Sequence, residues 1–155
     1  MSRGSRPRLA IAAAVSVAVL LVGCAPSDPE KDISDLLDMR ARAFATKDIE
    51  LFKRCLAPNY QTPADAVREH FEFWDEIEMR VLDRSIVLES PDRAVVYQRY
   101  QLRVKKGDDW QVLPPAVEKL VLTRTGRLFK RWRISGGLLP GEPSTGEPDR
   151  GGALE

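Results

Sequence analysis

The sequence predicts a single α+β domain, in which three N-terminal helices pack on a strongly curved, four-stranded antiparallel sheet in a cone-like arrangement. Two observations predict it. Apolar residues recur at three- and four-residue steps up to about residue 76, and at alternate positions from about residue 79 onward. Short turn sequences separate the alternating segments, and connections this short demand antiparallel hairpins. An antiparallel sheet with one apolar face places the helices on that face.

The first 23 residues are excluded from the domain because they are typical of an export signal. Arg3, Arg6 and Arg8 precede an unbroken run of apolar and small residues over 9–22. A helix of this length is about 21 Å long, which is short for a hydrocarbon core of roughly 30 Å. The segment therefore favours a cleaved signal peptide over 1–23.

The end of this segment, Leu21-Val22-Gly23-Cys24, resembles the lipobox of bacterial lipoproteins. The resemblance implies cleavage before Cys24, a diacylglyceryl group on its thiol and a further acyl chain, such as palmitate, on the new amine. Two or more acyl chains anchor a protein stably to a membrane. By the same resemblance, Ala25 favours the outer membrane, facing the periplasm, if the host has one. An ordinary secretory signal and an uncleaved anchor are the alternatives.

Composition divides the rest of the chain into a tether, a domain and a tail. Residues 24–31 hold the lipidated cysteine and a stiff tether with a reach of about 20 Å. Residues 32–137 form the domain, and residues 138–155, rich in Pro and Gly without an aromatic residue, are expected to be a disordered tail. The chain has 24 basic and 23 acidic residues, a balance that argues against a dedicated nucleic-acid binder.

The first two helices are predicted from periodicity and capping. Over residues 32–46, apolar side chains from Ile33 to Phe44 recur with helical spacing. Asp48 can cap a second, short helix, which Pro58 ends.

A third helix is predicted from Thr62 to about Glu76. Pro63 would occupy its first helical position, and Asp65 follows Thr62 by three residues, which resembles a capping box. His70 falls near the middle of the apolar arc of this helix.

Alternation and turn chemistry predict four strands after the third helix. Pro114 and Pro115 cannot donate ladder hydrogen bonds, so the third strand should be bulged there or lie at an edge. The strands are expected at about residues 79–89, 93–104, 110–123 and 127–135.

The order of these elements resembles the nuclear transport factor 2-like superfamily, which includes steroid-isomerase-like and polyketide-cyclase-like proteins. The segments that carry the resemblance are the short second helix closing in Leu56-Ala57-Pro58-Asn59-Tyr60 and the last strand, Phe129-Lys130-Arg131-Trp132-Arg133-Ile134. The resemblance implies a cone whose bent sheet and helices enclose a pocket open at one end. A cystatin-like domain or another helix on a curved sheet is the alternative fold.

Polar residues at positions where periodicity calls for apolar ones are candidates for the lining of such a pocket. They can form a polar floor that binds an anionic or carbonyl-bearing small molecule. The alternatives are a hydrogen-bonded core histidine for His70, and ion pairs of Arg40 or Lys130 with Glu118. The candidates are Arg40, His70, Gln98, Tyr100, Glu118 and Lys130, together with Trp74 and Trp132, which can line or plug the pocket.

The face on which Glu118 lies depends on the register of the last hairpin. A two-residue loop sets Val121 opposite Lys130, whereas a three-residue loop that contains Gly126 sets Leu122 there. We expect the second register, because it gathers more apolar residues on one face and brings Glu118 to the side of Trp132.

The function expected from these features is that of a membrane-anchored lipoprotein with a non-catalytic domain, which binds a small ligand or a cell-envelope protein. A homodimer through the sheet is a further expectation, because an apolar outer face is predicted. The alternative is an isomerase, cyclase or dehydratase that uses Glu118 with Tyr60 or Tyr100, or uses His70. The four residues expected to make the outer face apolar are Val95, Tyr97, Val121 and Phe129.

Metal and cofactor chemistry is not expected. The chain has one histidine, and Cys55 is the one cysteine besides Cys24. Neither a zinc motif nor a nucleotide-binding motif is present in the sequence. We expect Cys55 to be a buried thiol of the second helix.

Overall fold

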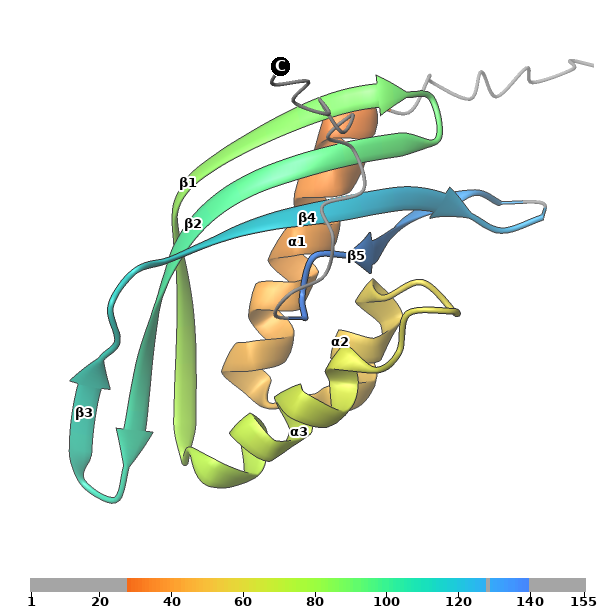
Figure 1. The fold of residues 1–155 in the computed structure, drawn as a ribbon. Helices are drawn as coiled ribbons and strands as arrows, with labels where there is room; N and C mark the ends of the chain where they lie inside the picture. The colour runs from red at the N-terminus through yellow and green to blue at the C-terminus, as the bar shows by residue number, and fades with distance from the viewer. Residues whose placement is uncertain (1–27, 128, 140–155) are drawn as a thin grey trace, which may run out of the picture.

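In a computed structural model of the chain, residues 28–127 and 129–139 are described (Figure 1). They confirm the predicted α+β class, with helices packed on one face of a curved antiparallel sheet. The predicted signal peptide, Cys24 and residues 140–155 lie outside the described residues. The elements are α1 (Pro29–Thr46), α2 (Ile49–Cys55), α3 (Pro63–Phe73), β1 (Glu76–Ser90), β2 (Arg93–Lys106), β3 (Asp109–Val112), β4 (Ala116–Thr125) and β5 (Arg131–Gly136).

Local capping explains where the first two helices begin. The Asp28 side chain accepts hydrogen bonds from the backbone of Glu30 and Lys31, so α1 starts within the segment predicted as tether. The Asp48 carboxylate accepts from the amide of Leu51 at 2.8 Å, which confirms its role as the cap of α2.

The predicted capping box of the third helix is wrong. Thr62 lies in the helical region and makes no side-chain cap bond, because a residue in that conformation already belongs to the turn. The helix also ends at Phe73 rather than near Glu76, where β1 begins.

The sheet has the order β1-β2-β4-β5, and β3 pairs with the far end of β2 (Figure 1). The single strand predicted over 110–123 is therefore two strands. The break falls at Pro114 and Pro115, which lack the amide hydrogens that a continuous ladder needs. Because β3 and β4 pair with different parts of the same long strand, they diverge where the sheet bends.

The last hairpin differs from both predicted registers. Leu122 pairs with Ile134 and Arg124 with Trp132, so the connection spans residues 126–130. The expected orientation of Glu118 nevertheless holds, because alternation from Leu122 puts its side chain on the face of Ile134.

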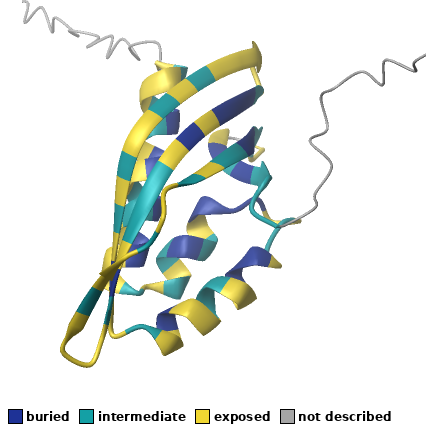
Figure 2. Cartoon of the chain, turned by 60° about the vertical axis from the view of Figure 1, so that its left-hand side comes forward, coloured by how far each residue is buried: buried dark blue, intermediate teal, exposed yellow. Residues whose placement is uncertain are grey.

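The hydrophobic core lies between the helices and the inner face of the sheet. The Phe44 ring contacts those of Phe52 and Phe71 edge to face, at centroid distances of 5.8 and 5.4 Å. Figure 2 shows buried positions along the helices and exposed positions along the outer edge of the sheet. None of the described helices is long and apolar enough to cross a membrane.

The outer face of the sheet is only partly as predicted. Tyr97 and Phe129 are exposed, whereas Val95 and Val121 are buried within this chain. Two of the four residues expected to make the outer face apolar are therefore exposed on the surface.

Candidate functional site

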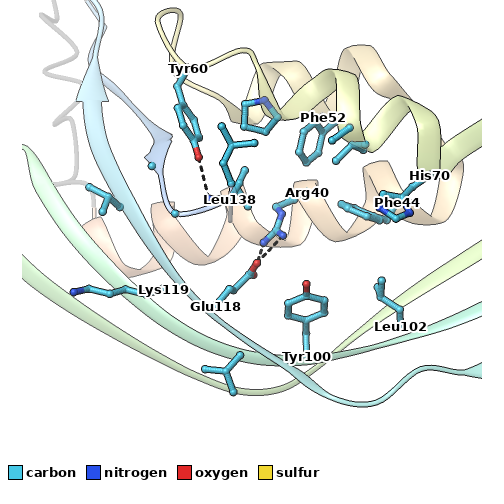
Figure 3. A pocket seen from close by; sticks show the side chains of 18 of the residues that line it. Arg40, Phe44, Phe52, Tyr60, His70, Tyr100, Leu102, Glu118, Lys119 and Leu138 are labelled. Carbon is cyan, nitrogen blue, oxygen red and sulfur yellow. Dashed lines mark hydrogen bonds and ion pairs between the residues drawn. The ribbon is translucent and has the colours of Figure 1, made fainter. Parts of the chain in front are cut away.

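A cavity of about 890 Å³ lies between the helices and the inner face of the sheet (Figure 3). Every helix and four of the strands, β1, β2, β4 and β5, contribute to its lining, and most of the side chains are apolar. The apolar lining includes Phe44, Phe52, Val67, Trp74, Ile77, Leu102, Val104 and Leu138, and the polar lining includes Arg40, Tyr60, His70, Tyr100 and Glu118.

The centre of the cavity holds an ion pair between Arg40 of α1 and Glu118 of β4. Arg40 Nη1 donates to Glu118 Oε1 at 2.5 Å, and Arg40 Nη2 donates to Oε2 at 2.9 Å. The Arg40 side chain is buried and that of Glu118 is 10% exposed, and Figure 3 shows them pointing toward each other from opposite walls. Paired guanidinium and carboxylate groups of this geometry bind strongly and directionally.

This pair is the inner end of a hydrogen-bonded chain that reaches the surface. Gln98 Nε2 donates to Glu118 Oε1 at 3.0 Å, and Arg84 Nε donates to Gln98 Oε1 at 2.8 Å. Arg84 in turn donates from Nη1 and Nη2 to Oδ1 of the exposed Asp38 at 3.2 Å. Glu118 thus accepts hydrogen bonds from Arg40 and from Gln98, and Arg84 holds Gln98 in place.

Arg84, Gln98 and Glu118 are direct cross-strand neighbours on β1, β2 and β4. Arg84 was not among the residues that periodicity singles out. A β-bulge between Val81 and Asp83 shifts the alternation of β1, so that even-numbered residues face inward beyond it. A bulge leaves no sequence signal here, which is why alternation alone could not find Arg84.

Tyr100 adds a free donor to the cavity. Its side chain enters from β2 with the hydroxyl toward the interior (Figure 3). Burial, and the nearby Glu118 carboxylate, raise the pKa of Tyr100, with an opposing effect from Arg40. The phenol is therefore neutral at physiological pH, and its hydroxyl has no hydrogen-bond partner among the described residues.

His70 and Trp74 line the cavity from α3 and the residue that caps it, but His70 is exposed. His70 thus lines the cavity as a candidate of the apolar arc, and its exposure contradicts the alternative of a hydrogen-bonded core histidine. The buried residues Ala64 and Phe71 contact the core, which leaves His70 at the mouth.

Two predicted lining residues lie elsewhere. Lys130 is exposed, and its Nζ pairs with Asp92 at 2.7 Å, because β5 begins only after it and does not carry it into the inner row. Trp132 is buried beneath the Arg124 guanidinium, whose carbon lies 5.4 Å from the ring centroid, and does not line the cavity. The cavity is therefore not plugged by Trp132.

The C-terminal end of the described chain forms part of the wall. The amide of Leu138 donates to the Tyr60 hydroxyl at 2.9 Å, and Leu138 and Leu139 line the cavity. Gly137 makes this path feasible, because its φ is 92° and a Cβ there would lie 1.9 Å from the Lys119 carbonyl oxygen. Leu138 and Leu139, which the composition assigns to the tail, therefore contribute to the wall of the cavity.

No cluster of metal-ligating side chains occurs within the part of the chain that the structure describes. Cys55 is buried, as predicted, and its thiol donates to the carbonyl of Leu51 at 3.4 Å. Burial raises the pKa of this thiol to about 11, so the reactive thiolate is scarce at neutral pH.

The fold resembles that of several solved proteins. A protein from Streptomyces avermitilis, proposed to be a dehydratase of the NTF2-like family, has 11% identity and a TM-score of 0.57, over 69% of this chain and 91% of that chain. An NTF2-like protein of unknown function from Shewanella oneidensis has 20% identity and a TM-score of 0.52, over 70% and 95%. A Catenulispora acidiphila protein in complex with S-DNPA has 10% identity and a TM-score of 0.59, over 70% and 89%.

At these identities the likeness concerns the fold alone, and the chain has the fold of nuclear transport factor 2-like proteins. No protein-family model matches the sequence, and neither does any curated protein. Since enzymes and binding modules share such folds, function has to be argued from the cavity.

Proposed function

We propose that this chain is a lipid-anchored envelope protein whose cavity binds a small, mainly apolar molecule without transforming it. The observation that carries the proposal is the cavity of about 890 Å³, which has apolar walls and a compact polar centre. Sites for small molecules are typically of this size and have a few polar groups that orient the ligand.

The state of Glu118 favours binding over catalysis. A general base must accept a proton from the substrate at hydrogen-bond distance. The two oxygens of Glu118 already accept hydrogen bonds from Arg40 and Gln98. Oε1 accepts two of these bonds, so a proton would go to Oε2, and neutralising Glu118 there would leave the buried Arg40 guanidinium without its counter-ion, which is costly.

Binding can be tested with N-phenyl-1-naphthylamine, an apolar dye whose fluorescence rises in a dry site. We expect saturable enhancement with the full chain. Ala66 and Glu69 are both exposed on α3, but only Ala66 lines the cavity, so Ala66→Trp should obstruct it and weaken the enhancement, whereas Glu69→Trp adds the same bulk outside the lining. Absence of enhancement, or equal loss in both variants, would contradict a ligand function for this cavity.

The anchor is proposed from the resemblance of Leu21-Val22-Gly23-Cys24 to a lipobox. Since α1 begins at Pro29, few residues would separate an acylated Cys24 from the domain. At roughly 3 Å per residue, this distance keeps the cavity close to the lipid surface, in the outer membrane if the host has one. Mass analysis of protein extracted from membranes should show the acyl groups, and Cys24→Ser should lack them. An unmodified wild-type protein would overturn the anchor.

A catalytic alternative is an isomerase, cyclase or dehydratase, and one observation favours it. The Glu118 carboxylate and the Tyr100 hydroxyl line the same cavity, as a base and a donor would. An enzyme that abstracts a proton beside a carbonyl should exchange the methyl protons of 2-acetylnaphthalene in D₂O, which NMR detects. Exchange with the wild type, but not with Glu118→Gln, would establish catalysis in place of simple binding.

A further inference from the structure

We infer that Glu118 determines the charge of the ligand. Glu118 binds the Arg40 guanidinium within the cavity, so the cavity binds uncharged molecules in preference to anions. These molecules would carry a hydrogen-bond acceptor for Tyr100. The inference rests on the proposed binding function and names the ligand class that this site accepts.

The first step concerns the cation that an anionic ligand would need. Arg40 is the buried cation of the lining, with 3% of its surface exposed. Its two terminal nitrogens bind the two oxygens of Glu118, so a protein carboxylate already occupies the place of a ligand carboxylate. An anion brought to Arg40 would lie beside that carboxylate and be repelled by it.

The second step concerns the mobility of Glu118. Gln98 binds Oε1, and Arg84 and Asp38 hold Gln98 in turn. Glu118 therefore cannot turn away from Arg40 without leaving buried donors unpaired, which costs about 1 to 3 kcal/mol for each group. An anionic ligand would have to provide that energy before it gained anything from Arg40.

The other cations of the lining do not replace Arg40. Arg93 pairs with Glu89 at 2.6 Å, and the Lys119 ammonium lies 5.7 Å from the centroid of the Tyr97 ring. Figure 3 shows Lys119 pointing away from the polar centre. The charges within the chain of bonds from Asp38 to Arg40 also balance, so a charged ligand would enter an apolar site without a counter-ion.

The third step concerns the hydroxyl of Tyr100, an uncharged hydrogen-bond donor of the cavity. The Tyr100 hydroxyl faces the cavity and has no partner among the described residues. The raised pKa of Tyr100 keeps its proton in place. A ketone, ester or ether oxygen can accept this hydrogen bond, while the apolar body of the ligand packs against such side chains as Phe44 and Leu102.

Two probes of nearly the same shape test the inference. 2-Acetylnaphthalene is an uncharged ketone, and 2-naphthoate replaces its methyl group with a carboxylate oxygen. Calorimetry of the full chain in a non-ionic detergent, with the heat of each probe entering protein-free micelles subtracted, gives the two affinities. We expect the ketone to bind at least 10-fold more tightly. Tyr100→Phe should weaken ketone binding about 5-fold, the equivalent of about 1 kcal/mol, and leave naphthalene binding unchanged.

Glu118→Gln frees the Arg40 guanidinium and should raise naphthoate affinity by 10-fold or more. The double variant Arg40→Met/Glu118→Met removes both charges and should keep the preference for the ketone. Circular dichroism checks that each variant is folded. If Glu118→Gln does not fold, the wild-type affinity ratio and Tyr100→Phe still decide.

Equal affinity for the two probes, or tighter naphthoate binding, would overturn the inference and leave ligand binding standing. A folded Glu118→Gln variant without gain in naphthoate affinity would overturn it as well. If neither these probes nor N-phenyl-1-naphthylamine bind, the proposed function fails together with the inference.

Discussion

The guanidinium of Arg40 and the carboxylate of Glu118 join the first helix to the fourth strand through two hydrogen bonds of 2.5 and 2.9 Å. Both groups are largely removed from water, and the interaction between them compensates for the hydration energy that each loses on folding. The ion pair therefore lines the cavity and also stabilises the two walls that form it.

Loss of one partner should cost more than loss of both. Arg40→Met leaves Glu118 buried without its counter-ion and should lower the free energy of unfolding by about 3 to 5 kcal/mol. The double variant Arg40→Met/Glu118→Met should recover most of that loss. Urea unfolding followed by circular dichroism measures both. Additive losses in the double variant would contradict a coupled pair.

Substitutions along the chain of hydrogen bonds that supports Glu118 should destabilise the protein less as they approach the surface. Gln98→Leu leaves Arg84 Nε without its partner and removes one of the two hydrogen bonds that Glu118 Oε1 accepts, and should cost about 2 to 3 kcal/mol. Asp38→Ala removes an exposed carboxylate at the other end and should cost less than about 1 kcal/mol. Equal effects in urea unfolding would contradict the gradient.

Gly137 should tolerate no side chain. Its φ is 92°, and a Cβ would lie 1.9 Å from the Lys119 carbonyl oxygen, so Gly137→Ala must displace the wall that carries Leu138. We expect a loss of roughly 3 kcal/mol, which combines backbone strain with overpacking. Gly107→Ala is the matched control, because φ is 60° there with nothing within 4 Å of the Cβ, and should cost about 1 kcal/mol. Scanning calorimetry compares them, and similar melting temperatures would refute the close approach.

Cys55 should make stability fall at high pH. The pKa of its thiol is about 11 in the folded chain, against an ordinary value of 9.0. The unfolded state therefore loses this proton first as the pH rises. The stabilising contribution is complete below pH 9 and is lost progressively between about pH 9 and 11. The difference corresponds to roughly 3 kcal/mol at about 1.4 kcal/mol per pKa unit.

Cys55→Ala provides the control for this pH dependence. The variant is expected to be less stable at neutral pH, because it leaves a small cavity. Its free energy of unfolding should nevertheless change less than that of the wild type between pH 9 and 11. Parallel pH profiles for the two proteins would refute the assignment to Cys55.

Periodicity predicted the three helices, the antiparallel pairing and most of the polar residues of the site, because one-sided burial leaves a regular pattern in the sequence. Arg40 interrupts a helical stripe, and Glu118 lies in phase with buried leucines, so both could be found. The pattern failed where the backbone departs from regular spacing. The bulge beside Val81 concealed Arg84, and the start of β5 at Arg131 removed Lys130 from the inner row.

Tertiary context explains the remaining differences. Leu138 follows two glycines in a segment whose composition is typical of a tail, yet a hydrogen bond to Tyr60 and the cavity wall hold it. His70 satisfies helical periodicity but lies at the opening of the cavity, where the sheet no longer covers α3. Both environments depend on residues that are distant in the sequence, so neither can be predicted from a short segment of the chain.

The separation in sequence between Arg40 and Glu118 also has a kinetic consequence. Their bonds join residues 78 positions apart, and Glu118 reaches its place only when β4 has paired with β2. Contacts that close such long loops tend to form after the local helices and hairpins. We therefore expect φ values near zero for Arg40→Met, which should accelerate unfolding and leave the folding rate nearly unchanged. Stopped-flow measurements across the urea range would give both rates. With φ near zero, the polar centre of the cavity would be among the last parts of the molecule to form during folding and among the first to separate during unfolding.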